Sequence, residues 1–235
     1  MQDKSGRPVN HFFDALAGEY TESIERCFPR YREMLWAIID YLPYTEALES
    51  PSANILELGA GTGNLSVVAA DRFPNASFSL VDVSGQSLDV CRKRLATAKA
   101  EFHEQDFRDL EFSAGEFDLV ISCISIHHLE SEAKKELFAK IFRWLTPGGT
   151  LAFADQNSGE TAELYQRHIQ NWKRDSLDAG STDEEFQMWM DHQAEHDYHE
   201  TLHNQSQWLR ETGFSQVDCV WRYLLWTVTQ ARKNG

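Results

Sequence analysis

The segment with the clearest chemical signal is a glycine-rich turn, ELGAGTG, at residues 57–63. Gly59, Gly61 and Gly63 allow the backbone to turn tightly and to approach a ligand with no Cβ in the way. The spacing is GxGxG, and Asn64 stands where the dinucleotide fingerprint GxGxxG requires its third glycine. The pattern therefore predicts a cofactor-binding turn and disfavours a nicotinamide dinucleotide.

Two carboxylates follow at the ends of the next predicted strands. Asp82 ends a strand expected over 76–82, where a carboxylate can accept both hydrogen bonds from a ribose diol. Asp106 follows a strand expected over 100–105, and Phe107 beside it offers a flat aromatic face. A carboxylate and an aromatic ring together suit an adenine. The three strand ends predict an adenosine site without phosphate contacts.

A scaffold with parallel strands is needed to bring these strand ends together. From Asn54 onward, strand and helix patterns alternate, with strands expected over 54–58, 76–82, 100–105, 117–123 and 150–155 and helices over 65–72, 86–98 and 131–145. This alternation predicts an α/β fold, Rossmann-like and doubly wound, with a mainly parallel sheet. The tail, 217–223 and 225–231, has β-rich composition and a tight connection, which predicts an antiparallel pair.

Helical segments are expected on both sides of this alternating core, within one domain spanning residues 1–235. Helices over 9–26 and 30–42 form an N-terminal unit, residues 9–45, and a further helix is expected over 201–212. Residues 158–200 are polar, prone to form helix and longer than an ordinary crossover needs. We expect this stretch to be a helical lid insertion over the carboxyl edge of the sheet.

The motifs resemble those of the class I S-adenosylmethionine-dependent methyltransferases. The matching pieces, in the family's order and spacing, are ELGAGTG at 57–63, LVD at 80–82, QDF at 105–107, FDLVISCISIHHL at 117–129 and LTPGGTL at 145–151. FDALAGEY at 13–20 also resembles a segment that many members fold over the cofactor. The resemblance implies a seven-stranded sheet whose last strand is antiparallel, with S-adenosylmethionine as cofactor and S-adenosylhomocysteine as product.

The same resemblance implies a role for each matching residue. It places the methionine part of the cofactor beside the glycine turn, the ribose on Asp82, and the adenine between Val83, Asp106 and Phe107. The cofactor-binding residues that it implies are Tyr20, Tyr31, Glu57, Gly59, Ala60, Gly61, Gly63, Asp82, Val83, Asp106, Phe107, Ser122 and Cys123.

A narrower resemblance accounts for Tyr31. Pro29-Arg30-Tyr31 and the end pattern at 208–228 are similar to the branch that holds ubiquinone/menaquinone-type methyltransferases and the carboxy-S-adenosylmethionine synthase of tRNA wobble-uridine modification. Arg30 replaces a glycine of that branch.

The implied activity is transfer of the sulfonium methyl group to a small-molecule acceptor by in-line displacement, mainly through alignment and desolvation. The alternatives are a carboxy-S-adenosylmethionine synthase-like or tRNA-modification enzyme, and a non-catalytic protein that binds the cofactor. A net charge of −15, from 22 basic and 37 acidic residues, makes a nucleic-acid partner an unfavourable one.

Several polar residues are candidates for the acceptor side. His127 follows the fourth strand, where it would orient or deprotonate the acceptor, although a histidine pair that only caps the loop is an equally simple interpretation. Asp155 and Asn157 end the fifth strand, and Arg222 with Tyr223 would hold a carboxylate if both side chains point inward. A surface arginine beside a core tyrosine is the alternative for that pair.

The insertion contains histidines at ligand-like spacing. His192, His196, His199 and His203 would share one face of a continuous helix, but Thr201 is typical of a helix start that would divide the stripe. We assign no metal and take His196 and His199 as the best candidates for lid residues that face the acceptor, with a solvated helix face salt-bridged by neighbouring acids, or a divalent-metal site, as the alternatives. Trp172 and Trp189 are expected to pack the insertion onto the sheet edge, with an aromatic cage for a cationic acceptor as the alternative.

The remaining features favour a cytoplasmic, soluble protein. The four cysteines, Cys27, Cys91, Cys123 and Cys219, form no CxxC pair, which fits a reducing compartment. The polar N-terminus lacks a secretory apolar region, and no apolar run reaches the about 20 residues that span a bilayer. A homodimer is left open.

Overall fold

The computed structural model describes residues 10–43 and 45–235. Its helices are α1 (Asn10–Leu16), α2 (Tyr20–Cys27), α3 (Tyr31–Asp40), α4 (Glu46–Glu49), α5 (Asn64–Arg72), α6 (Gly85–Arg94), α7 (Ser131–Trp144), α8 (Ala162–Asp178), α9 (Asp183–His196) and α10 (Leu202–Thr212), with short 3-10 turns η1 (Phe107–Asp109) and η2 (Ile126–His128). The strands are β1 (Asn54–Leu58), β2 (Ser77–Asp82), β3 (Lys99–Glu104), β4 (Phe117–Cys123), β5 (Leu145–Ser158), β6 (Glu200–Thr201), β7 (Gln216–Tyr223) and β8 (Trp226–Arg232).

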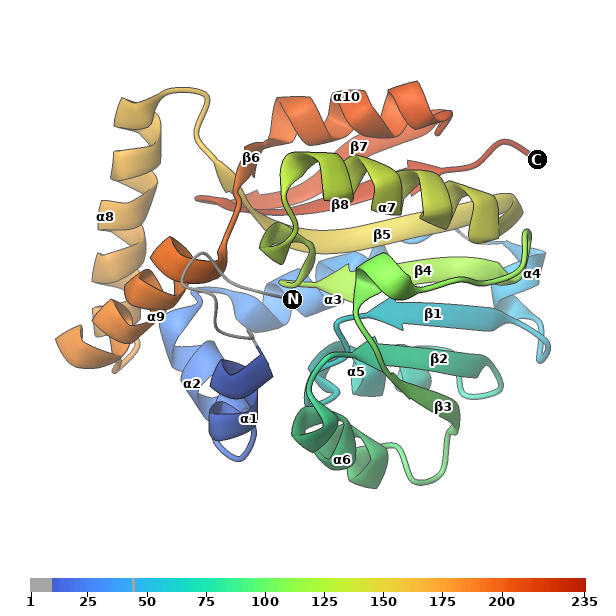
Figure 1. The fold of residues 1–235 in the computed structure, drawn as a ribbon, viewed down its shortest axis with the longest axis horizontal. Coiled ribbons are helices and arrows are strands. Elements are labelled where there is room, and N and C mark those ends of the chain that lie inside the picture. Colours follow the sequence, from blue (N-terminus) through green and yellow to red (C-terminus); the bar gives the residue numbers. More distant parts are fainter. Residues whose placement is uncertain (1–9, 44) are drawn as a thin grey trace.

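Seven strands form the main sheet, in the order β3-β2-β1-β4-β5-β8-β7 (Figure 1). β1 to β5 run parallel to one another, and β8 is antiparallel to both β5 and β7. The predicted α/β fold, with a mainly parallel sheet and an antiparallel last strand, is confirmed. Because the order reverses between β1 and β4, the carboxyl ends of these strands border the crevice in which such sheets bind ligands.

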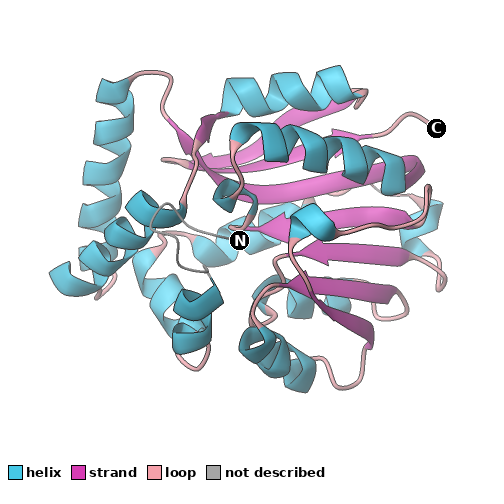
Figure 2. Ribbon diagram, in the orientation of Figure 1, coloured by secondary structure: helices cyan, strands magenta, loops and turns pink. Residues whose placement is uncertain are grey.

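Helices cover both faces of the sheet and form two hydrophobic cores (Figure 2). One core joins the sheet to α3, α5 and α6 through residues such as Ile38, Leu65 and Leu88. The other core joins it to α7 and α10 through Phe138 and Leu209. With both faces buried, the central strands β1 and β4 are largely apolar, as the sequence of β4 indicated, whereas the edge strand β3 is polar.

α1, α2, α8 and α9 gather at the end of the sheet to which the arrows of β1 and β4 point (Figure 1). α8 and α9 lie within the extra stretch 158–200, and hydrogen bonds and an ion pair tie them to α2 rather than to the sheet alone. Trp172 Nε1 and Ser176 Oγ both donate to the Cys27 carbonyl, at 2.5 and 2.7 Å. Arg26 pairs with Glu185 at 3.0 Å. The N-terminal helices and the insertion therefore form one continuous cover.

Several predicted boundaries differ from the observed ones. The helix expected over 9–26 divides into α1 and α2, because the N–H of Glu19 closes a turn on the Leu16 carbonyl and Gly18 disfavours helix; Val9 lies outside the described residues. The strand expected over 150–155 is longer, since Leu145 pairs with Phe117 at one end. At its other end β5 pairs with the unexpected β6.

Within residues 10–43 and 45–235, no helix is both long enough and apolar enough to cross a membrane.

Candidate functional site

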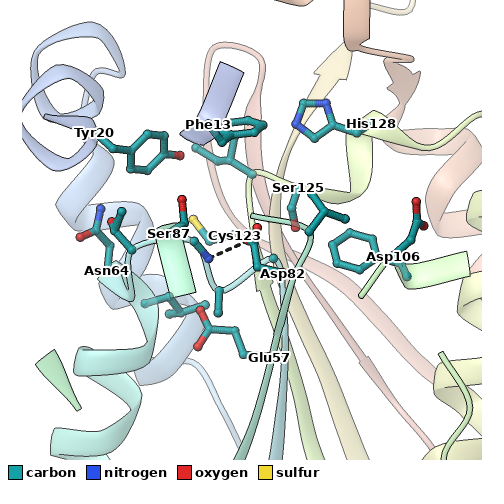
Figure 3. Close-up of a pocket in the computed structure, with 18 of the residues that line it drawn as sticks. Phe13, Tyr20, Glu57, Asn64, Asp82, Ser87, Asp106, Cys123, Ser125 and His128 are labelled. Atoms are coloured by element: carbon teal, nitrogen blue, oxygen red, sulfur yellow. Dashed lines mark hydrogen bonds between the residues drawn. The ribbon is translucent and has the colours of Figure 1, made fainter. Parts of the chain in front are cut away.

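A cavity of about 770 Å³, here called the main cavity, opens at the carboxyl ends of β1, β2 and β4 (Figure 3). Most residues that the sequence predicts for the cofactor line it: Tyr20, Tyr31, Glu57, Gly59, Ala60, Gly61, Asp82, Val83, Asp106, Phe107 and Cys123. The cavity thus collects residues from the N-terminal helices and from four successive strand ends.

The glycine turn is held against the neighbouring strands. The N–H groups of Gly59 and Ala60 both donate to the Val81 carbonyl, at 2.8 and 2.9 Å. Gly59 has a φ of +73°, and a Cβ there would lie 2.3 Å from Ser125 Oγ. Ser125 in turn hydrogen bonds to the Leu58 carbonyl at 3.1 Å. Glycine is therefore required at position 59 for conformation and for space.

Asp82 braces two loops of the main cavity. One carboxylate oxygen accepts a hydrogen bond from Gly61 N–H at 2.8 Å, and the other from Ser84 N–H at 2.9 Å. Burial raises the pKa of Asp82, while these backbone donors oppose that shift. Each carboxylate oxygen has a second lone pair for a ligand hydroxyl.

Beside the glycine turn, the buried atoms Glu57 Oε2 and Thr62 Oγ1 lack a hydrogen bond among the described residues. Burial raises the pKa of Glu57 to about 8, although a hydrogen bond from Ser66 works in the opposite direction. Since buried polar groups are normally satisfied, these atoms indicate a polar ligand in the cavity.

The far side of the cavity is formed by the strand end of β3. Asp106 is bidentate to Arg108, with its Oδ2 2.7 Å from Nη2. Burial alone would raise the pKa of Asp106, but hydrogen bonds from Arg108 lower it to about 2. Phe107 is buried and contributes a ring to the wall.

Side chains of the cover close the near side. Phe13 contacts Tyr20 and His128 edge-to-face, with ring centroids 6.2 and 5.6 Å apart. Burial raises the pKa values of Tyr20 and Cys123 above their ordinary range, so both groups are neutral near pH 7. Tyr31 accepts a hydrogen bond from Asn64 Nδ2 at 3.3 Å.

A second, narrow pocket lies beneath α8 and α9, and we call it the inner chamber. It shares Phe13, Tyr20, Ile124 and His128 with the main cavity. Its other lining residues are Phe28, His127, Gln156, Trp172, Trp189, His192, Gln193 and Asp197. The shared residues place the two cavities side by side.

His127 is buried at the inner chamber and hydrogen bonded to Asp155 through Nδ1. Asp155 is fully buried at the end of β5 and also accepts from the N–H of Gln156 at 2.9 Å. Burial lowers the pKa of His127, although the carboxylates of Asp197 and Asp155 counteract it. A neutral imidazole held in this way keeps its proton on Nδ1 and presents Nε2 to its surroundings.

Some predicted residues lie outside both cavities. Gly63 caps the N-terminus of α5, and Ser122 bonds to the Leu58 carbonyl at 2.8 Å. Asn157 is buried between Thr227 and Gln205, at 2.7 and 2.8 Å. These residues shape the site without lining it.

Arg222 and Tyr223 point away from the cavities. Arg222 is exposed and donates to the Leu224 carbonyl at 3.1 Å. Tyr223 donates to Asp175 at 2.5 Å, and the guanidinium of Arg30 lies over its ring. The left-handed φ of +61° at Arg30, where the narrower branch has glycine, leads into this contact.

The four-histidine stripe is not continuous. α9 ends at His196, and the exposed His203 belongs to α10. His196 borders an outer groove, whereas His199 is bonded to Tyr165 at 2.9 Å and lies 3.3 Å from Asp197. The fold instead brings His192 and His199 to His127 and His128.

Several lining residues were not predicted: Thr62, Asn64, Leu65, Ser87, Ile124 and Ser125. Asn64 was interpreted only as a missing glycine. Ser125 lies two residues beyond β4 and reaches the glycine turn through the sharp turn at Ile124, whose φ is +51°. No pattern in the sequence indicates that turn, so only the structure identifies Ser125.

Comparison with known proteins places these features in context. A family model described as Methyltransferase domain matches residues 55–149. Carboxy-S-adenosyl-L-methionine synthase from Helicobacter hepaticus is 24% identical over 226 residues, which cover 94% of this chain and 94% of that protein.

Solved structures share the fold over most of the chain. Haemonchus contortus phosphoethanolamine N-methyltransferase 2, in complex with phosphomonomethylethanolamine and S-adenosylhomocysteine, has a TM-score of 0.68 at 17% identity and covers 97% of this chain and 61% of its own. A DhpI–SAH complex has a TM-score of 0.64 at 16% identity, covering 96% of this chain and 95% of its own.

Proposed function

Because the chain belongs to the class I S-adenosylmethionine-dependent methyltransferases, we propose that it moves the sulfonium methyl group to a small-molecule acceptor in the inner chamber. The observation that carries this proposal is the pair of adjoining cavities, which share Phe13, Tyr20, Ile124 and His128. Methyl transfer needs one compartment for the cofactor and one for the acceptor, with a common wall where the methyl group passes.

The residues of the main cavity fit S-adenosylmethionine. Asp82 supplies carboxylate lone pairs for a ribose diol, and Phe107 supplies a flat face for the adenine. The polar methionine end would bind Glu57 Oε2 and Thr62 Oγ1. These two buried atoms have no hydrogen-bond partner among the described residues. Because Gly59 has no side chain and packs against Ser125, the cofactor would contact only backbone atoms at this position.

The chemistry supplied by the bound cofactor is an electrophilic methyl group on a sulfonium. The chain's own contribution is alignment, since a well-oriented pair of reactants gains about 7–11 kcal/mol over free collision. Tyr20, Phe13 and Ile124 exclude water at the junction. Tyr20 and Cys123 are neutral there, so neither carries a charge that competes with the acceptor.

A general base is required only where the acceptor must lose a proton. We propose His127 for that task, since Asp155 holds its Nδ1 and His127 lines the inner chamber, with Nε2 3.6 Å from Asp197 Oδ1. Asp155 is then a positioning residue. Asn157, Arg222 and Tyr223 have no place in this proposal, because they line neither cavity.

A carboxy-S-adenosylmethionine synthase-like activity is the second candidate, since relatives of that name match the chain along most of its length. A carboxylated sulfonium ligand needs a cationic partner for its extra carboxylate. Among the described residues that line the two cavities, none is an arginine or a lysine. This absence favours methyl transfer over a carboxy-S-adenosylmethionine synthase-like reaction.

Charge and architecture disfavour an RNA-modifying enzyme, a nicotinamide enzyme and a protein that only binds the cofactor. A net charge of −15 disfavours RNA, and Asn64 disfavours a nicotinamide dinucleotide. A protein that only binds the cofactor would not need a second pocket beside the cofactor position. The four free cysteines support a reducing, cytoplasmic location, and a homodimer stays a prediction for size-exclusion chromatography.

Two measurements test the proposal. Calorimetry should detect binding of S-adenosylmethionine and S-adenosylhomocysteine but not of NAD. Incubation with methyl-labelled S-adenosylmethionine and a small-metabolite extract, followed by mass spectrometry, should show label in a small molecule. The absence of cofactor binding would refute the assignment, and label found only in RNA or protein would refute the acceptor class.

A further inference from the structure

Four imidazoles surround the buried carboxylate of Asp197. Oδ1 lies 3.0 Å from His128 Nδ1, 3.6 Å from His127 Nε2 and 3.9 Å from His192 Nε2. Oδ2 lies 3.3 Å from His199 Nε2. All five side chains are more than 90% buried. They come from η2, α9 and the loop after α9, so the cover must be in place to assemble them.

The hydrogen bond to Asp155 determines what His127 presents to this cluster. Asp155 Oδ1 accepts from the Gln156 N–H as well, so it acts as an acceptor and His127 Nδ1 carries the proton. The Nε2 lone pair of neutral His127 then faces the carboxylate oxygen of Asp197. Two acceptors in such proximity repel unless a proton or a metal ion lies between them.

His128 and His199 also face the carboxylate of Asp197. His128 Nδ1 is buried and makes no hydrogen bond of good geometry among the described residues, although Asp197 Oδ1 is 3.0 Å away. His199 is oriented by Tyr165, which bonds to its Nδ1 at 2.9 Å. An outer ring nitrogen held by a carboxylate, as in His127, with the inner nitrogen facing the cluster, is typical of an imidazole that ligates a metal.

We propose that His127 Nε2, His128 Nδ1 and Asp197 Oδ1 bind a divalent first-row transition-metal ion, with His192 Nε2 available as a fourth ligand. The candidate ligand atoms of His127, His128 and Asp197 lie within 4.8 Å of one another. Tetrahedral ligands at zinc–nitrogen distances would be about 3.3 Å apart, which is close to the observed separations. A nitrogen- and oxygen-rich set without thiolates suits Zn²⁺, Fe²⁺, Co²⁺ or Mn²⁺.

The charges near the cluster are compatible with a divalent ion. Asp155 and Asp197 supply two buried carboxylates. The buried amine of Lys134 donates to the Tyr198 carbonyl. The negative charges of Glu200, Asp155 and Asp197 all favour the protonated form of this amine. The backbone N–H of Tyr198 donates to the His127 carbonyl at 2.8 Å, which fixes the Asp197 loop against η2.

The ion would sit in the wall of the inner chamber, because His127, His128, His192 and Asp197 all line that cavity. An open coordination position would hold an acceptor through an oxygen, nitrogen or sulfur donor. This role rests on the proposed function, whereas the metal site itself does not. With Nε2 on the ion, His127 cannot also act as a base, and a metal-bound hydroxyl or thiol loses its proton more readily without one.

The test is a titration of tag-free, chelator-treated protein with Co²⁺, followed through its visible d–d absorption and through competition with Zn²⁺. We expect one Co²⁺ per chain, and a fall in affinity of at least about 100-fold in His127→Ala, His128→Ala and Asp197→Asn. Asp155→Asn should weaken binding by about 10- to 100-fold, as loss of an outer partner does. His203→Ala, which removes an exposed histidine, is the matched control and should bind as wild type does.

Calorimetric measurement of S-adenosylhomocysteine binding shows whether each variant is folded. It also tests the proposed function independently of the metal site. The metal site is refuted if wild type binds no stoichiometric Co²⁺, if the three ligand variants retain wild-type affinity, or if His203→Ala loses affinity equally. Cofactor binding without Co²⁺ binding refutes only the metal site, and Co²⁺ binding without cofactor binding refutes only the proposed function. If a single-ligand variant does not fold, His192→Gln serves as the replacement, with an expected loss of about 10-fold or more.

Discussion

The carboxylate of Asp82 and the backbone N–H of Gly61 are hydrogen bonded at 2.8 Å, although 21 residues separate them in the chain. The bond ties the end of β2 to the turn that follows β1. Since the other carboxylate oxygen accepts from Ser84 N–H, a single acid shapes both loops beside the ribose position. Because the Asp82 carboxylate keeps lone pairs for ligand hydroxyls, we expect Asp82 to contribute directly to cofactor affinity.

Replacement of Asp82 by Asn should weaken cofactor binding. A hydrogen bond to a charged group contributes about 1.5–3 kcal/mol, so we expect a loss of affinity for S-adenosylhomocysteine of about 10- to 100-fold. Isothermal titration calorimetry measures this loss of affinity. Asp89→Asn, an exposed acid of α6 that pairs with Arg92, is the control and should change affinity by less than about twofold. Equal affinities for Asp82→Asn and wild type would contradict the ribose assignment.

Gly59→Ala should destabilise the protein more than an ordinary glycine replacement in the left-handed region. Gly115 has a similar φ, +70°, but a Cβ there meets nothing within 4 Å. We therefore expect Gly115→Ala to cost about 1–2 kcal/mol from backbone conformation alone. Gly59→Ala adds a clash with Ser125, which should cost about 1–3 kcal/mol more.

Urea denaturation of both variants measures this difference. The double variant Gly59→Ala/Ser125→Gly removes both contacting atoms and should recover most of the added cost. If the double variant is no more stable than Gly59→Ala, steric contact with Ser125 is not the cause.

The alternating strands and helices could be predicted because each is indicated by residues that are close together in the sequence. The apolar run of β4 was assigned its observed bounds, and Thr201 and Gly213 mark the start and end of α10 by capping. The strand ends then follow from topology, which is why the glycine turn and Asp82 could be placed at one site from sequence, whereas Glu57 was placed there only by the family resemblance.

Contacts that depend on the cover could not be predicted. Whether Arg222 points inward depends on how β7 pairs with β8 at the sheet edge, and one register step reverses the side chain. His199 and His127 meet only because the loop after α9 returns to η2, through the bond from Tyr198 N–H to the His127 carbonyl. Spacing along α9 suggested a histidine stripe, whereas the cluster that formed draws on three separate segments.

Glu57 should give the stability of the unliganded protein a distinct pH dependence. Burial raises its pKa to about 8, from an ordinary value of 4.5 in the unfolded chain. Between these values the folded protein retains a proton that the unfolded chain releases. The contribution of Glu57 is thus fully present below about pH 4.5 and is lost as pH rises toward 8.

Glu57→Gln cannot ionise and should lack this slope. The free energy of unfolding of the variant, minus that of wild type, should increase by a few kcal/mol between about pH 5 and pH 8. Denaturant titrations across this range measure the difference, with the exposed Glu46→Gln as a control that should show none. A flat difference for Glu57→Gln would mean that Glu57 is ionised in the folded protein.

Arg222→Ala should have no effect on cofactor binding. Its guanidinium is exposed and bonds to the Leu224 carbonyl, away from both cavities. We expect affinity for S-adenosylhomocysteine to stay within about twofold of wild type. Tyr31→Phe provides the contrast, because it removes a hydroxyl in the main cavity that accepts from Asn64, and should weaken binding by about two- to tenfold. A strong effect of Arg222→Ala in calorimetry would show that the edge strands move to the site.

Trp189→Ala should separate cofactor binding from methyl transfer. Trp189 is 5% exposed, packs edge-to-face on Phe28 with centroids 5.0 Å apart, and lines the inner chamber but not the main cavity. Removal of the indole costs about 3–5 kcal/mol of stability and leaves a void where the acceptor must be aligned. A misplacement of about 1 Å can reduce the rate 100-fold, so we expect a similar loss of transfer with nearly unchanged affinity for S-adenosylhomocysteine.

Transfer is measured as label moved from S-adenosylmethionine into the metabolite extract, at a temperature where calorimetry shows that the variant still binds cofactor. Trp36→Ala is the matched control, because Trp36 is 51% exposed on α3 and lies outside both cavities. It should transfer methyl groups at the wild-type rate. Wild-type transfer by Trp189→Ala would instead mean that the acceptor binds outside the chamber, since a void of that size in its wall cannot leave alignment intact.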